Sequence, residues 1–200
     1  MRHTTLPASP IAQLRTIELT PDCAPLLQAF FDDNPAYFLA TSGEPAALDE
    51  AHEEITSEVP ADWSFTKKWV VGYAEEHGSL VAMANVITDL LAASVFQIGT
   101  FIVATDRHGT GDAQLLYRGL EDWAATNGAA WMRLGVVQGN TRAERFWASM
   151  GYVAVRERRD IQMGNRMVTV QNMVKSLDGG TIEQYFALVP RDRPEGERAL

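Results

Sequence analysis

A glycine-bearing turn between an apolar run and a helical pattern carries the clearest chemistry in this chain. The run Val95–Val103 predicts a strand, and apolar residues at helical spacing over 115–124 predict a helix. A strand, a tight turn and a helix together point free backbone N–H groups and a positive dipole end at an anion. A side chain at Gly109 or Gly111 would hold a phosphate away from those amides. The turn predicts an anion site, although its spacing alone favours a phosphate ligand only slightly over a plain turn.

Two common phosphate-binding loops do not fit this turn. A Walker-type loop needs Gly-Lys-Ser/Thr at its end, and here Asp112 and Ala113 follow Gly111. A dinucleotide fingerprint needs a third glycine near Gln114 and an acidic residue closing the next strand. That strand, expected over 131–137, ends without one.

A second segment, 140–152, lies about a helix's length downstream. With the turn, it resembles the GNAT superfamily of acetyl-CoA-dependent N-acetyltransferases, whose turn reads Arg/Gln-x-x-Gly-x-Gly/Ala. The family's later motif reads Asn-x-x-Ala-x-x-Phe-Tyr-x-x-x-Gly-Phe. The residues in register with it are Asn140, Ala143, Phe146, Trp147, Gly151 and Tyr152. The resemblance covers about 14–175, and its diagnostic part is 95–152.

The resemblance implies an α/β fold of GNAT type, with a mixed, mainly antiparallel sheet, splayed parallel central strands and flanking helices. Acetyl-CoA would lie in a wedge between the strands that end at Val103 and Val137. A strand bulge would aim the Ile102–Val103 backbone at the thioester carbonyl, and the Val103 amide would stabilise the oxyanion. The implied cofactor-binding residues are Ile102, Val103, His108, Gly109, Thr110, Gly111, Asp112, Ala113, Asn140, Ala143, Phe146 and Trp147. No metal is implied.

Three of these positions carry alternative interpretations. His108 stands where the family has Arg or Gln, so it either donates to a phosphate oxygen or is a spectator beside backbone amides. Trp147 replaces a tyrosine that protonates the leaving thiolate in many members; an indole N–H cannot act as that acid, so Trp147 either hydrogen-bonds the sulfur or lines the cofactor cleft. Asn140 either contacts the cofactor or begins a helix, and the first is preferred because Thr141 could cap the helix itself.

The acid, the base and the acceptor site are less defined. Some relatives use a carboxylate on the fourth strand as base, and residues 96–101 contain none. Other candidates lie in expected turns, where a solvated charge is the commoner role: Glu75, Glu76, His77, Asp89 and Asp106. No base or acid is assigned. The first two helices and the loop before the fourth strand should form the acceptor pocket, with Asn34, Tyr37 and Phe38 as candidate substrate contacts and Trp63 and Trp69 as further aromatics. The alternative for each of these residues, and the commoner role, is packing in the core.

Further elements must position these residues. We expect strands over 14–19, 69–74, 80–87, 152–162 and 167–175, and helices over 24–31, 46–57, 111–126 and 141–150. Residues 60–67 should be irregular. We expect an N-terminal extension over 1–13, one domain over 14–177, and a C-terminal tail over 178–200 whose polar end is disordered or contacts a partner.

Composition limits the class of protein. The chain has 200 residues, 46% of them apolar, which suits one well-formed core. A net charge of −9 argues against a nucleic-acid partner. The single Cys23 excludes an internal disulfide, and neither a signal peptide nor a membrane span is evident. We therefore expect a cytoplasmic protein, with a homodimer possible through 181–189.

The leading hypothesis is acetyl transfer from acetyl-CoA to a primary amine of a small molecule or peptide, by direct attack in a ternary complex. The competing hypothesis is an acyl-CoA-binding sensor with little turnover, which Trp147 and the missing base favour. A structural domain without a cofactor would require both motifs to be coincidental. The sequence does not identify the amine.

Overall fold

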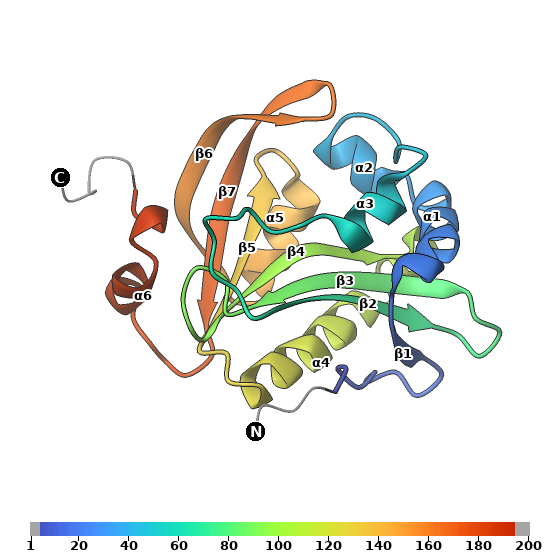
Figure 1. Ribbon diagram of the computed structural model, residues 1–200, viewed down its shortest axis with the longest axis horizontal. Coiled ribbons are helices and arrows are strands. Elements are labelled where there is room, and N and C mark those ends of the chain that lie inside the picture. The colour runs from blue at the N-terminus through green and yellow to red at the C-terminus, as the bar shows by residue number, and fades with distance from the viewer. Residues whose placement is uncertain (1–4, 195–200) are drawn as a thin grey trace.

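A seven-stranded sheet forms the centre of the molecule in a computed structural model that describes residues 5–194. Its order is β1-β2-β3-β4-β5-β7-β6; β4 and β5 pair in parallel and the other neighbours pair antiparallel. The mixed, mainly antiparallel sheet expected above is confirmed. The strands are β1 (Arg15–Glu18), β2 (Lys67–Ala74), β3 (Leu80–Thr88), β4 (Val95–Val103), β5 (Trp131–Val137), β6 (Val153–Met163) and β7 (Arg166–Ser176) (Figure 1).

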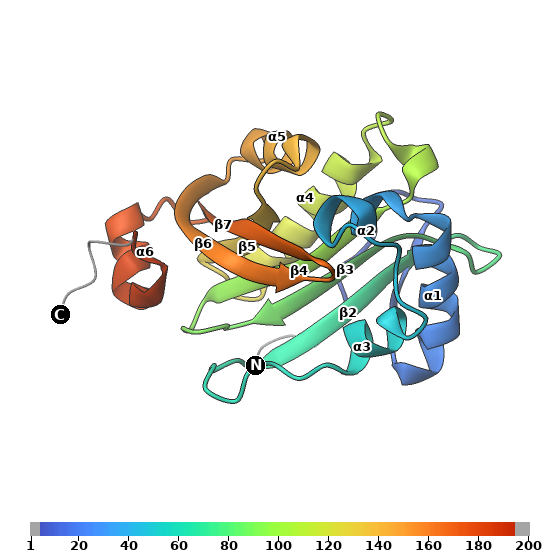
Figure 2. The same cartoon turned by 90° about the horizontal axis from the view of Figure 1, so that it is seen from above.

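Helices cover both faces of this sheet. Figure 2 shows α4 and α5 on one face and α1 and α3 on the other. Alternating strand residues supply a separate apolar cluster to each face, one including Leu120 and Trp147, the other Leu27 and Phe31. The helices are α1 (Ala24–Asp33), α2 (Ala36–Thr41), α3 (Glu50–Thr56), α4 (Asp112–Thr126), α5 (Thr141–Ser149) and α6 (Ile182–Leu188), with short 3₁₀ turns at Pro21–Cys23, Thr105–Arg107 and Pro190–Asp192.

The two parallel strands separate midway along their length. Their pairing runs from Val95 with Trp131 to Ile98 with Leu134. There β4 contains a bulge: Asn85 of β3 faces Thr100 and Val86 faces Ile98, so Gly99 is the extra residue. Beyond it β4 follows β3, while β5 follows β7, and a wedge opens between them.

Most expected elements are present, with corrections at the first helices and the tail. Helix α3 begins at Glu50 instead of 46, and α2 occupies a stretch to which the sequence assigned no element. Part of the expected tail packs on its own chain, because Tyr185 and Asp192 are buried; 195–200 lie outside the described residues. Within the expected N-terminal extension, Leu6 and Ile11 pack against the core. In the described part of the chain, no helix is long and apolar enough to cross a membrane.

Candidate functional site

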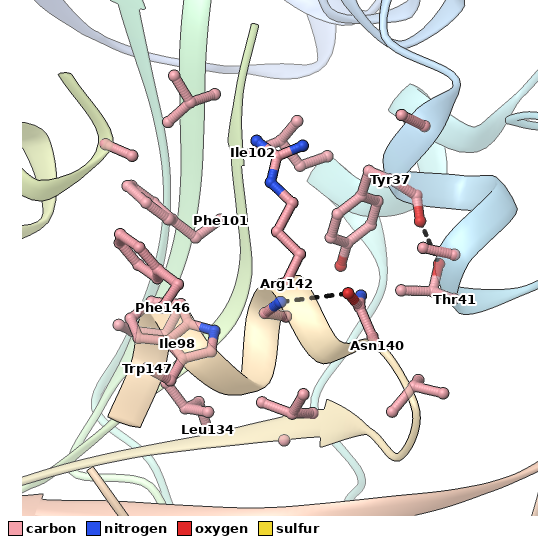
Figure 3. A pocket seen from close by; sticks show the side chains of 18 of the residues that line it. Tyr37, Thr41, Ile98, Phe101, Ile102, Leu134, Asn140, Arg142, Phe146 and Trp147 are labelled. Carbon is pink, nitrogen blue, oxygen red and sulfur yellow. Dashed lines mark hydrogen bonds between the residues drawn. The ribbon is translucent and has the colours of Figure 1, made fainter. Parts of the chain in front are cut away.

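A cavity of about 270 Å³ occupies the wedge between β4 and β5. Residues 98, 99 and 101–103 of β4 and 134–137 of β5 contribute to its walls, together with α5 and the segment from Asn34 through α2. Figure 3 shows Tyr37 and Arg142 extending into it from opposite helices, with Phe101, Phe146 and Trp147 along one side. Of the predicted site residues, it is lined by Asn34, Tyr37, Ile102, Val103, His108, Ala113, Asn140, Ala143, Phe146 and Trp147.

The backbone of Val103 faces this wedge. Peptide groups of successive strand residues point to opposite sides, and Ala104 N–H donates to Val81 O of β3 at 2.8 Å. The N–H and C=O of Val103 therefore point away from β3, toward the gap left by β5. The bulge expected near Ile102–Val103 lies instead at Gly99, where the glycine tolerates close approach to the Asn85 side chain.

His108 is bound to the same peptide group. Its Nε2 lies 2.9 Å from Val103 O, and since a carbonyl oxygen only accepts, Nε2 carries the proton. Burial lowers the pKa of His108; the Val103 hydrogen bond opposes the shift, and the positive charge of Arg142 adds to it. The neutral ring then presents an unprotonated Nδ1, which cannot donate to a phosphate oxygen.

The glycine turn has the expected shape. Gly109 and Gly111 have φ of +85° and +95°, which other residues rarely adopt, and a Cβ on either would meet no described protein atom within 4 Å. Gly111 is the N-cap of α4. The Thr110 hydroxyl accepts from Asp112 N–H at 3.2 Å, and the Asp112 carboxylate is paired with Arg107 at 3.1 Å. Thr110 and Asp112 thus brace a turn whose glycine surfaces are open.

Helix α5 begins at the opposite wall of the cavity. The Asn140 side-chain oxygen accepts from Ala143 N–H at 3.2 Å, which makes Asn140 the N-cap (Figure 3). Thr141, which could have capped the helix on sequence alone, already lies within the first turn, so the alternative interpretation of Asn140 as the residue that begins the helix holds. Asn140 also lines the cavity, and capping uses its oxygen and leaves the amide N–H₂ as a possible donor.

Sequence reasoning missed Arg142. Its side chain stands in the cavity, and it makes no ion pair with any described residue. Among the described lining residues it carries the one permanent positive charge. A usable signal was available: a cation in the first helical turn is unfavourable to the helix dipole, so an external anion partner could have been suspected.

Aromatic rings form the apolar side of the cavity. Phe101 and Phe146 stack with centroids 6.2 Å apart, and Trp147 packs edge-on to Phe146 at 4.9 Å. Trp147 is buried against Tyr117 and Tyr152, whose hydroxyls bond each other at 3.1 Å. Trp147 therefore acts as a wall, and the Tyr117 and Tyr152 hydroxyls are engaged outside the cavity lining.

The predicted acceptor residues have different surroundings. Both ends of the Asn34 amide are used, on Phe30 O at 2.8 Å and on Thr105 N–H at 2.7 Å, so Asn34 joins α1 to the loop after β4. Tyr37 lines the cavity, whereas Phe38 is buried against Phe31 and does not.

The expected contribution of the loop before β4 is not found, because none of residues 89–94 lines the cavity. Of the two further aromatics, Trp69 packs on Trp123 in the core, and Trp63 lines a different cavity. The β6–β7 hairpin supplies Met163 and Val170 to the cavity walls instead.

A carboxylate that the sequence did not suggest lies beside Tyr37. Glu54 of α3 accepts from Asn85 Nδ2 at 2.6 Å and from the Thr100 hydroxyl at 3.1 Å. Burial and the negative charge of Glu54 raise the pKa of Tyr37, so its hydroxyl stays protonated. Strand β4 has no acidic residue in this region, but Glu54 of α3 contacts Thr100, next to the bulge at Gly99. Because Glu54 and Thr100 are far apart in the sequence, no local sequence pattern predicts their contact.

The carboxylates and histidine first considered as bases are engaged or distant. Asp89 accepts from Thr66 and Ser94, and Glu75 pairs with Arg107 and His77. None of Glu75, Glu76, His77, Asp89 or Asp106 lines the cavity, and Glu54 does not line it either, but the charge of Glu54 acts on the lining residue Tyr37. Among the described residues, no group of three or more His, Cys, Asp or Glu could hold a metal.

The site suits a long ligand with an anionic end. The wedge offers Val103 N–H in its lining and aromatic rings along one side, and the open turn at the start of α4 presents amides to a phosphate. Arg142 adds a guanidinium, which binds phosphate strongly. The described residues therefore fit the acetyl-CoA that the sequence predicts.

Comparisons with known proteins agree with this arrangement. A family model described as acetyltransferase (GNAT) family matches residues 20–152. An acetyltransferase from Thermus thermophilus has a similar structure, with a TM-score of 0.62, 21% identity, and coverage of 84% of this chain and 99% of that chain. Among curated proteins, none matches.

Two further similar structures have amine acceptors in their names. Spermidine N-acetyltransferase from Vibrio cholerae, in complex with CoA and spermine, has a TM-score of 0.62 and 15% identity, covering 83% of this chain and 96% of that chain. The ribosomal-protein-S18-alanine N-acetyltransferase from Escherichia coli has a TM-score of 0.59 and 14% identity, covering 84% and 97%. At these identities the likeness shows the fold.

Proposed function

Because this chain belongs to the acetyltransferase (GNAT) family, we propose that it transfers an acetyl group from acetyl-CoA to a primary amine of a small molecule or peptide, by direct attack in a ternary complex. The observation that carries the proposal is the wedge between β4 and β5, accompanied by an open glycine turn and, behind its lining residue Tyr37, by the carboxylate of Glu54. Structural neighbours named for spermidine and for a ribosomal-protein alanine support an amine acceptor.

The proposal gives the wedge residues distinct roles. Acetyl-CoA supplies the activated acetyl group. Val103 N–H faces the position where negative charge develops during acyl transfer, and a fixed donor there lowers the barrier. His108 holds the Val103 peptide through its carbonyl, and Arg142 takes the phosphate contact that the neutral His108 does not make.

Glu54 gives the acceptor end a negative charge. Glu50 lies one turn earlier on α3, and both carboxylates contribute to the raised pKa of Tyr37, so they act on the same region. An ammonium group is attracted there, and Glu54 can accept its proton, directly or through a water, before the amine attacks. The acceptor is therefore expected to be a cationic amine.

The sensor hypothesis retains one observation in its favour. Trp147 is a buried wall at the position of the family's acid, and Tyr117 and Tyr152, which pack against it, are not among the described lining residues. In that case acyl-CoA would bind while amine-dependent turnover stayed low.

The test measures thermal stability and turnover in the same preparations. A ligand that binds the native state raises Tm, so acetyl-CoA should stabilise the wild type and fail to stabilise Gly111→Trp, whose indole would fill the turn. Arg142→Gln should weaken acetyl-CoA binding about tenfold, as for loss of a charged hydrogen bond, while Arg145→Gln on the same helix should not. Thiol release with a panel of amines then separates enzyme from sensor. No stabilisation of the wild type at high acetyl-CoA concentration would refute the proposal.

A further inference from the structure

A second cavity, of about 640 Å³, shares no lining residue with the wedge and has an unusual charge. Five arginines line it, and we call it the arginine groove: Arg133, Arg156, Arg158, Arg191 and Arg193, with Asp62, Trp63, Pro190 and Asp192. The groove joins β6 to the segment after α6, which lie side by side in Figure 1, and to the loop before β2. The proposed acetyl transfer uses none of these residues.

The charges of the groove do not cancel within its lining. Arg133 and Asp192 form a bidentate pair at 2.6 and 2.9 Å, which neutralises both. Arg158, Arg191 and Arg193 then face one remaining lining carboxylate, that of Asp62, in a chain whose net charge is −9. Like charges held together raise the energy of the folded state, and a bound anion relieves that cost.

Several of these side chains are fixed in place. The Arg156 guanidinium donates to Arg191 O, and the Arg191 guanidinium lies over the Trp63 ring at 4.4 Å. Among the described residues, neither Arg158 nor Arg193 has an ion-pair partner. On the alternate positions of β6, Glu157 and Arg159 pair with each other at 3.2 Å and do not line the groove.

We propose that the arginine groove binds a small molecule carrying two or more phosphate or carboxylate groups. A guanidinium binds either group through two parallel N–H···O bonds, and several of them select ligands of high charge. The lining comes from four segments far apart in the sequence, so the anion would hold together the loop before β2, β5, β6 and the segment after α6.

The experiment uses the full chain at constant ionic strength, with inorganic pyrophosphate and citrate as probes. We expect at least one of them to raise the Tm of the wild type by about 3 °C at ten times its Kd. Pyrophosphate acting alone identifies phosphate as the preferred group, and citrate acting alone identifies carboxylate. Arg158→Gln should weaken binding at least tenfold, and Arg158→Gln with Arg193→Gln should abolish it.

Two further variants make the result specific. Arg159→Gln removes the same charge from the neighbouring position of β6 and should bind like the wild type. Gly111→Trp should also retain binding, because the glycine turn is a separate site. No shift with either probe, or unchanged binding in Arg158→Gln, would overturn the inference. Binding lost only in Gly111→Trp would assign the anion to the glycine turn and also overturn it, without affecting the proposed acetyl transfer.

Discussion

Val103 and His108 meet through one hydrogen bond, and that bond decides which ring nitrogen of the histidine stays unprotonated. The lowered pKa of His108 also affects stability. As the pH falls through the ordinary histidine value of about 6.5, the unfolded chain takes up the proton before the folded one. The stabilisation from a neutral His108 is therefore present above that pH and lost below it.

At the residue scale, the most specific prediction about catalysis concerns Glu54. Glu54→Gln keeps the size of the side chain but removes the proton acceptor, so kcat should fall at least about 100-fold with little change in Tm. The defect should shrink as the pH rises toward the pKa of the acceptor amine, since the amine then arrives neutral. Turnover measured across the pH range, with the exposed Glu53→Gln as control, checks this. A uniform loss at all pH values would indicate a structural role instead.

Helix α5 starts at the cavity, so the residue that begins the helix also touches the site. Asn140 satisfies one free N–H of the first turn while its amide nitrogen remains available. Helix geometry then brings Ala143, Phe146 and Trp147 onto the wall that borders the wedge. The family motif thus contains both the residue that caps α5 and the residues with which α5 lines the cavity.

Two substitutions at Asn140 separate these functions. Asn140→Ala should cost about 1 kcal/mol of unfolding free energy, because the cap is lost. Asn140→Asp retains a capping oxygen, so stability should hold, while CoA binding should weaken about three- to tenfold through loss of the N–H donor. Denaturant titration and calorimetry measure the two effects. Wild-type CoA affinity in Asn140→Asp would limit Asn140 to capping.

At the scale of the whole molecule, a buried ion pair fastens the C-terminal segment to the sheet. Asp192 accepts from Arg133, from Asn172 Nδ2 at 2.9 Å and from the Tyr185 hydroxyl at 2.6 Å. Burial opposes its ionisation, but these hydrogen bonds and the charge of Arg133 outweigh burial and lower the pKa of Asp192. Its contribution to stability is therefore present above the ordinary aspartate range and lost as the pH falls through the folded pKa.

Removing the Asp192 carboxylate should lower the free energy of unfolding. Asp192→Asn leaves the buried Arg133 without a counter-charge, and breaking one partner of such a pair costs about 3–5 kcal/mol. The denaturant midpoint should fall accordingly at neutral pH, and the difference from wild type should narrow in acid. Glu183→Gln, on the exposed face of α6, should leave the midpoint nearly unchanged. An unchanged midpoint in Asp192→Asn would show that the C-terminal segment adds little stability.

Local patterns in the sequence were sufficient for much of the fold. Hydrophobic periodicity predicted β4, α4, β5 and α5 closely, because each is governed by contacts near in sequence. Gly109 and Gly111 marked the turn, since positive φ is a local requirement. The topology itself came from the resemblance of two motifs, and the parallel pair β4–β5 confirms it.

The tertiary structure alone decided which side chains from distant elements meet. Glu54 reaches Thr100 across 46 positions, and Asp192 reaches Arg133 across 59. Charged residues such as these look like solvated surface in the sequence, because burial and partners depend on how the elements pack. Sequence periodicity therefore determined the elements and the glycine turn, while packing determined the acceptor-side carboxylate, the role of the C-terminal segment and the arginine groove.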